Sequence, residues 1–81
     1  MSTEIGRIDK NKNTKIVIRM SKFKGMQLCD VREYIESDQY TGFTKKGISI
    51  RKDKIEELIE LLNQAKDIEE LEEDEYKGEE K

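Results

Sequence analysis

The hydrophobic pattern of this chain changes its period once, near Arg51, and that change limits the folds it can adopt. Before Arg51, apolar and polar residues alternate, most clearly in 15–20, which is typical of strands with two different faces. After it, four apolar residues follow the i, i+3, i+4, i+7 spacing of an amphipathic helix: Ile55, Leu58, Ile59 and Leu62. We therefore expect an α+β domain in which strands precede a single helix.

The alternating part of the chain divides into four predicted strands, at 5–8, 15–20, 26–35 and 47–50. The dipeptide Lys24-Gly25 predicts a tight connection before the third strand, because glycine relieves the steric demand of a turn. Turn-forming residues also occupy 9–13, 37–39 and 41–42. Neither face of the third strand is wholly apolar, so either a β-bulge or a contact with a second copy is expected there.

The predicted helix has two alternative starts. Asp53 with Glu56 three residues later is compatible with a capping box, and a start one turn earlier, near Arg51, fits equally well. At the other end, Ile68 and Leu71 could prolong the helix by a turn or two. The apolar stripe must cover a sheet face or a partner helix, so replacing Leu58 by Asp should be severely destabilising.

The small apolar content predicts self-association. Of the 81 residues, 33% are hydrophobic and 43% are charged, so a monomer buries little apolar surface. Packing against a second copy is an economical remedy for a chain of this size. We expect a homodimer whose interface or core includes the helix stripe.

The charge is strongly divided along the chain. Residues 1–52 carry 12 Lys and Arg against 6 Asp and Glu, a net +6, whereas residues 67–81 carry 2 against 9, a net −7. A clustered basic surface attracts polyanions even when the whole protein is acidic. We expect a nucleic-acid-binding domain at 1–66 and an acidic tail at 67–81, mobile beyond about residue 72. The tail either solubilises the protein or occupies the basic groove in competition with nucleic acid.

Catalytic chemistry has little support in the composition. The chain has no histidine, and its single cysteine, Cys29, lies within a predicted strand as a small hydrophobe. The run 45–47 lacks the spaced glycines and the Lys-Ser/Thr ending of a phosphate loop. We expect no enzyme activity, no cofactor and no metal site. Without a signal peptide or a long apolar run, the chain is expected inside the cell, in the cytoplasm and nucleoid or in a nucleus.

Cationic and aromatic side chains are interleaved in the strand region. This combination suits single-stranded nucleic acid, because cations meet phosphates and flat rings stack on unpaired bases. We predict that these residues converge on one concave surface, the alternative being lysines that merely coat a small soluble domain. The predicted nucleic-acid-binding residues are Arg19, Lys22, Phe23, Lys24, Arg32, Tyr34, Tyr40, Phe43, Lys45, Lys46 and Gly47.

The order of four short motifs adds a family resemblance. They are Ile5-Gly6, Phe23-Lys24-Gly25, Asp30-Val31-Arg32-Glu33-Tyr34 and Lys45-Lys46-Gly47-Ile48-Ser49-Ile50, followed by the amphipathic helix. The segment from Ile5 to about Ala65 thereby resembles the single-stranded-DNA-binding domain of the transcriptional coactivator positive cofactor four. The resemblance implies a curved four-stranded antiparallel sheet followed by one C-terminal helix, in a homodimer with paired channels for single strands.

The resemblance also implies roles for individual residues. Phe23 would stack on a base, Lys24 would meet a phosphate, and Arg32 would sit in the channel. Lys45 and Lys46 would form part of its basic rim.

Two positions depart from the family pattern. Met26 stands where a second lysine follows the glycine, so one phosphate contact is expected to be missing. Ile35 stands where an aromatic ring often follows the tyrosine, so one stacking platform is expected to be lost, and binding should be weaker than is typical.

The expected function is sequence-tolerant binding of single-stranded DNA by a homodimer, in transcription coactivation, replication or repair. Components of the transcription machinery are expected as protein partners. Binding to a membrane is not expected. Two alternatives remain open. One is an RNA-binding module, because stacking and phosphate contacts do not exclude a 2′-hydroxyl. The other is a protein-interaction module that uses the helix and the acidic tail.

Overall fold

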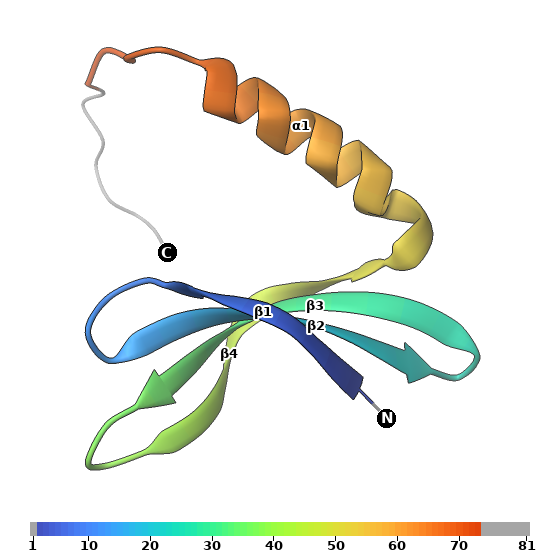
Figure 1. Ribbon diagram of the computed structural model, residues 1–81, viewed down its shortest axis with the longest axis vertical. Helices are drawn as coiled ribbons and strands as arrows, with labels where there is room; N and C mark the ends of the chain where they lie inside the picture. Colours follow the sequence, from blue (N-terminus) through green and yellow to red (C-terminus); the bar gives the residue numbers. More distant parts are fainter. Residues whose placement is uncertain (1, 74–81) are drawn as a thin grey trace.

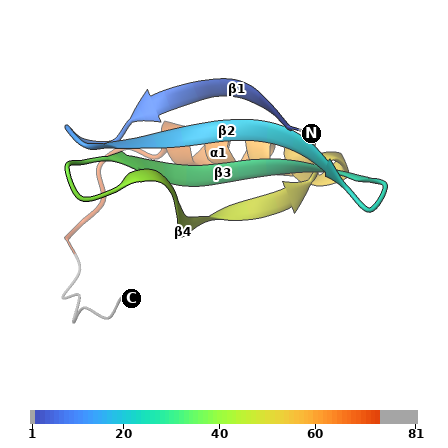
Figure 2. The same cartoon turned by 90° about the horizontal axis from the view of Figure 1, so that it is seen from below.

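The computed structural model describes residues 2–73, which form four strands followed by one helix (Figure 1). The elements are β1 (Ser2–Asp9), β2 (Thr14–Phe23), β3 (Met26–Glu36), β4 (Thr41–Arg51), a short 3-10 turn η1 (Lys52–Lys54) and α1 (Ile55–Asp67). The strands form one antiparallel sheet in the order β1-β2-β3-β4, and Figure 2 shows them side by side. The predicted α+β fold, an open curved sheet followed by a C-terminal helix, is confirmed.

The central hairpin, β2 and β3, is regular along its whole length. Its register runs without interruption from the pair Thr14 and Ile35 to the pair Phe23 and Met26. Lys24 and Gly25 close it as a two-residue turn with φ values of 52° and 80°. Positive φ at both positions matches the right-handed twist of the flanking strands, which explains why the connection is so short.

Both outer strands are interrupted by bulges. The register of β1 against β2 shifts between Glu4 and Gly6, and that of β4 against β3 shifts so that residues 44–46 lie opposite Glu33 alone. A bulge, one of the two alternatives expected for the third strand, therefore exists between β3 and β4, but its extra residues belong to β4. It also explains why β4 is longer than the predicted 47–50, because the strand continues across the bulge, and 41–42 belong to it rather than to a turn.

Cross-strand pairing on either side of the bulges sets alternate residues in rows across the sheet, so that each face has its own composition. One face, here called the polar face, has the rows Arg7, Val17, Arg32, Gly47 and Glu4, Arg19, Asp30, Ser49. The opposite face, here called the apolar face, includes Ile8, Ile16, Ile18, Met20, Cys29, Val31, Ile48 and Ile50. Val17 is fully buried beneath the arginines of the polar face, whereas Ile8 and Ile48 on the apolar face are more than half exposed.

The helical segment begins close to the earlier of the two expected starts, and it ends before the expected extension. No side chain caps its first turn, so the capping box of Asp53 and Glu56 does not form, and η1 starts at Lys52, close to the earlier alternative. α1 ends at Asp67, and Ile68 has extended backbone angles. The extension of the helix through Ile68 and Leu71 therefore does not occur.

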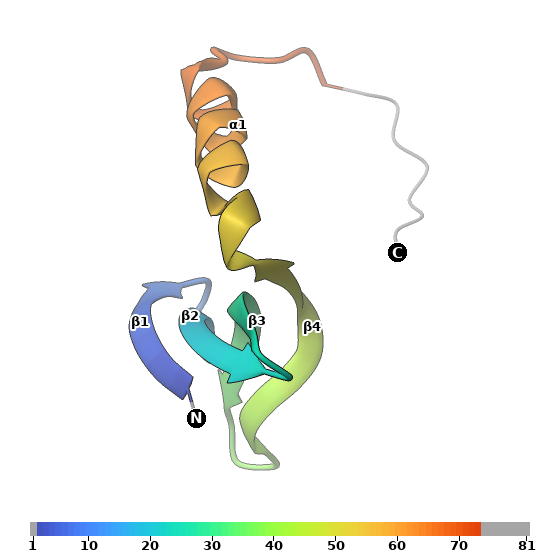
Figure 3. The ribbon, with the colours of Figure 1, turned by 90° about the vertical axis from the view of Figure 1, so that its right-hand side faces the viewer.

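The helix rises from the end of β4 and points away from the sheet (Figures 1 and 3). None of its residues is buried: Ile55 and Leu58 are half-buried, while Ile59 and Leu62 are exposed. The part of the apolar stripe formed by Ile59 and Leu62 is thus uncovered within residues 2–73. No helix among residues 2–73 is long and apolar enough to cross a membrane.

Candidate nucleic-acid interface

Asp30 is the centre of a polar network on the polar face. It lies in the middle of β3, only 7% exposed, directly between Arg19 of β2 and Ser49 of β4. Arg19 Nη2 donates to Asp30 Oδ2 (3.0 Å), and Ser49 Oγ donates to Oδ1 (2.9 Å). Arg32, two residues along β3 on the same face, donates from Nε and Nη2 at 3.0–3.2 Å. One carboxylate therefore fixes two guanidinium groups.

The network keeps this carboxylate ionised. Burial alone raises the pKa of Asp30, but hydrogen bonds from Arg32, Arg19 and Ser49 outweigh it and lower that pKa to about 2. In return, the hydrogen bond to Asp30 raises the pKa of Arg32. Two positive groups surround one negative group, so the cluster keeps a net positive charge on the polar face.

Aromatic rings continue the network toward the β3–β4 turn. The guanidinium carbon of Arg19 lies 3.9 Å from the ring centroid of Phe43, a cation–π contact. The rings of Tyr34 and Phe43 meet edge to face, with centroids 4.9 Å apart. Arg7 of β1 lies 5.1 Å from the Tyr34 centroid. Rings and cations from all four strands thus form one layer.

Arg32 has few donors left for a ligand. Besides its bonds to Asp30, its Nη1 donates to the carbonyl oxygen of Thr44 in the β4 bulge (3.2 Å). The side chain therefore ties β3 to the bulge. This makes it a rigid positive group rather than a freely reaching one.

The turn between β2 and β3 presents a second, more accessible group on the same face. Phe23 is 57% exposed, and the Lys24 ammonium lies 5.4 Å from its ring centroid. Lys24 has the left-handed φ of 52°, which side chains other than Gly, Asn and Asp adopt at a cost. Backbone strain of this kind often occurs at functional sites.

Other predicted site residues lie elsewhere. Strand alternation places Lys22 on the opposite face from Phe23. Lys45 lies in the bulge, and Lys46 lines a hollow of the apolar face with Ile16 and Glu33. The structure therefore brings Arg19, Phe23, Arg32, Tyr34 and Phe43 together on one face but sets Lys22 and Lys46 apart from them.

Tyr40 and Gly47 make local structural contacts. Tyr40 is about half exposed, and its hydroxyl donates to the carbonyl of Phe43. A Cβ atom at Gly47 would lie 2.4 Å from the carbonyl oxygen of Val31. Gly47 thus permits the close approach of β4 to β3 beside the bulge.

Sequence reasoning missed three members of the network: Arg7, Asp30 and Ser49. Each lies in a predicted strand, and Asp30 and Ser49 belong to the motifs quoted above. Which side chains meet depends on the register between strands, and the alternation within one strand does not contain that information. The pairing of Asp30 with Ser49 was therefore not available from periodicity.

Comparison with known protein families identifies the family of the chain. Residues 10–61, more than half of the chain, match the family model described as Transcriptional Coactivator p15 (PC4). The chain belongs to the PC4 family. This family is known for DNA binding and transcriptional coactivation, and its members are described as non-enzymatic regulators. No curated protein matches the chain.

Solved structures of PC4 homologues share the fold. A homologue from Burkholderia pseudomallei K96243 in its orthorhombic crystal form is 25% identical, with a TM-score of 0.74, covering 82% of this chain and 90% of that chain. Its tetragonal form is 27% identical, with a TM-score of 0.71, covering 82% and 98%. A bacteriophage T5 homologue, 16% identical with a TM-score of 0.64 and covering 79% and 75%, shows the fold alone. The resemblance drawn from the motifs is therefore confirmed.

Proposed function

We propose that this PC4 family member binds single-stranded DNA with little sequence preference through its polar face. The observation that carries the proposal is that hydrogen-bonded arginines and aromatic rings lie together on that face. Phe23 is accessible for stacking, which is worth about 1–3 kcal/mol per base. Arg19, Arg32 and Lys24 supply positive charge for phosphates. Asp30 already holds the two arginines in place before DNA binds.

Preorganisation explains the contribution of Asp30. A long cationic side chain loses rotamer freedom when it is immobilised on a ligand, at a cost of about 0.5–1.5 kcal/mol. Because Arg19 and Arg32 are already bonded to Asp30, part of that cost is met during folding. The single negative charge lowers the local potential without cancelling it.

We further propose that the working unit is a homodimer. Only Val17 and Cys29 are buried apolar residues among residues 2–73, which is a small core for a chain of this length. Much of the remaining large apolar surface belongs to β1, β4 and α1: Ile5, Ile8, Ile48, Ile59, Leu61 and Leu62. A second copy that covers the apolar face and the helix stripe would remove this surface from water.

DNA binding of this kind would serve transcription, replication or repair at the genome, in a nucleoid or a nucleus. The family description favours coactivation, with the transcription machinery as protein partner. The bacteriophage T5 homologue is implicated in recombination-dependent DNA replication, which makes replication a second candidate process. The tail at 67–81 is proposed as a separate acidic segment that follows the binding domain. The mobility expected beyond about residue 72 concerns residues that, from 74 on, lie outside the described part of the chain.

The test is a titration of labelled oligo-dT at two salt concentrations, with duplex DNA and oligo-rU of equal length as competitors. Tight binding of oligo-dT, weak binding of duplex and a salt slope of about −0.7 per phosphate contact are expected. Lys24→Gln should weaken binding more than its matched control Lys22→Gln, whose side chain lies on the opposite face. Preference for oligo-rU would favour the RNA alternative, and no binding to either would refute the proposal.

Two further measurements address assembly and the tail. Sedimentation equilibrium at micromolar concentration should give twice the chain mass, and a monomer there would contradict the dimer. Removal of 67–81 should raise affinity for oligo-dT at low salt if the tail occupies the groove. If the full-length and truncated chains bind oligo-dT equally at low salt and also at moderate salt, the tail is a solubilising segment.

A further inference from the structure

We propose that Arg51 is a phosphate-binding residue of this interface and contacts the backbone of single-stranded DNA beside the Phe23-Lys24 turn. The inference rests on the proposed function and adds a residue that neither the motifs nor the family match assigns. Arg51 is the last residue of β4 and pairs with Leu28 of β3. The same row continues through Ser21 of β2, so Arg51 belongs to the polar face that carries Arg19 and Arg32.

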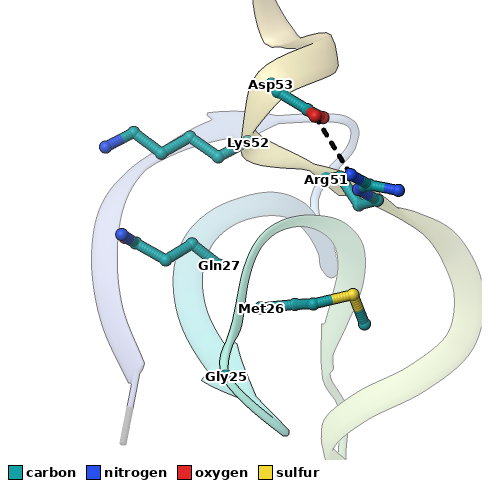
Figure 4. Close-up of a pocket in the computed structure, with 6 residues that line it drawn as sticks. All are labelled: Gly25, Met26, Gln27, Arg51, Lys52 and Asp53. Atoms are coloured by element: carbon teal, nitrogen blue, oxygen red, sulfur yellow. Dashed lines mark hydrogen bonds and ion pairs between the residues drawn. The ribbon is translucent and has the colours of Figure 1, made fainter.

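The position of Arg51 brings it next to the turn. Arg51 lines a hollow between the end of the β2–β3 hairpin and η1, together with Gly25, Met26, Gln27, Lys52 and Asp53. In Figure 4, Arg51 and Met26 point to one side of this hollow, whereas Lys52 and Gln27 point to the other. Met26 pairs directly with Phe23 across the turn. Met26 therefore lines the same hollow as Arg51 and also pairs with Phe23, whose ring is close to the Lys24 ammonium.

Arg51 is free to change its partner. Its side chain is 61% exposed, and its one ion pair within residues 2–73 is with Asp53, Nη2 to Oδ2 at 3.1 Å. Asp53 is equally exposed, and pairs of this kind contribute only about 0–1 kcal/mol and weaken with salt. By contrast, Arg32 uses Nε, Nη1 and Nη2 within the protein. Arg51 therefore offers donors that the part-buried Asp30 network does not.

A phosphodiester is the ligand that fits these features. The planar guanidinium presents paired N–H groups that match two phosphate oxygens. The exposed apolar pair of Phe23 and Met26 beside it suits the flat face of a base. A nucleotide seated with its base on Phe23 would direct the flanking phosphates of its strand toward Lys24 and Arg51.

The test compares Arg51→Gln with Lys52→Gln, which removes the same charge from the neighbouring residue on the other side of the hollow. Both variants are melted by circular dichroism to confirm that they fold. Arg51→Gln should weaken oligo-dT binding about 3- to 10-fold and reduce the salt slope by about 0.7, while Lys52→Gln leaves both close to wild type. Asp53→Asn should strengthen binding in the wild-type background and have a smaller effect beside Arg51→Gln.

Adding Met26→Lys to Arg51→Gln provides a rescue, because it restores a cation on the same side of the hollow, at the position where the family pattern has a lysine. Recovery of the lost salt slope supports a phosphate contact. If wild type binds oligo-dT but Arg51→Gln and Lys52→Gln are indistinguishable, the role of Arg51 is refuted and the proposed function stands. If wild type itself fails to bind, both are overturned.

Discussion

Replacing Asp30 by Asn tests whether the central carboxylate stabilises the sheet. Asp30 accepts hydrogen bonds from Arg19, Arg32 and Ser49, and it is nearly inaccessible to water. Asn has almost the same shape but carries no charge, and its amide nitrogen would face groups that are themselves donors. The substitution therefore removes the electrostatic part of the network and leaves its packing.

The magnitude follows from the pKa of Asp30. The folded protein lowers it from 3.8 to about 2, and each pKa unit corresponds to about 1.36 kcal/mol, so the ionised form contributes about 2 kcal/mol to the free energy of unfolding. Because the folded pKa is the lower one, this contribution is fully present above about pH 4. It is lost progressively as the pH falls from about 4 toward 2. Asp30→Asn should be about 2 kcal/mol less stable at pH 7.

Urea unfolding followed by circular dichroism, at one fixed protein concentration, measures both quantities. The stability difference between wild type and Asp30→Asn should shrink between pH 4 and pH 2.5. Asp53→Asn is the matched control, because Asp53 forms only an exposed ion pair and should change stability by less than about 1 kcal/mol. Equal stability of Asp30→Asn and wild type at pH 7, or a difference that does not change with pH, would refute the reasoning.

Three other substitutions have defined outcomes. Lys24→Asn should raise the free energy of unfolding by about 0.5–1 kcal/mol, because Asn tolerates the left-handed φ, while weakening oligo-dT binding; a shift of urea midpoint and affinity in the same direction would contradict this. Gly47→Ala should lower the free energy of unfolding by about 1–3 kcal/mol, because the added Cβ would lie 2.4 Å from the Val31 carbonyl oxygen. An unchanged melting temperature would show that β4 shifts to make room for the methyl group. Leu58→Asp should dissociate the proposed dimer in sedimentation velocity, because Leu58 is only half-buried in the single chain. A variant that remains a dimer of normal stability would show that α1 is not part of the interface.

The sequence predicted the parts of the fold that depend on local patterns. Alternation along 15–20 and the Lys24-Gly25 dipeptide are sufficient to specify the β2–β3 hairpin, because a two-residue turn fixes the register. Alternation of apolar and polar residues does not continue through a bulge, so the predicted strand at 47–50 was shorter than the observed β4. The Asp30 network depends on pairing among three strands, so only the motif, and not its contacts, was visible.

The end of the helix shows a different limit. Ile68 and Leu71 continue an apolar spacing, yet both are more than half exposed and lie among acidic residues. Helices in proteins gain most of their stability from packing of an apolar face, and these two side chains have no surface of the described chain to pack against. Periodicity records the spacing of side chains, but it does not record whether a partner surface exists.

The two bulged outer strands have a consequence for how copies of this protein can meet. The outer strands of an open sheet expose unpaired N–H and C=O groups, which invite further strands to add on and aggregate. Here the bulge at Ile5 and the lysine-bearing bulge at 44–46 break those rows of hydrogen-bonding groups, whereas the inner hairpin has no such break. Edge-to-edge addition of chains into one continuous sheet is thereby discouraged. Association through sheet faces and helices stays available, so that assembly can stop at a defined number of copies.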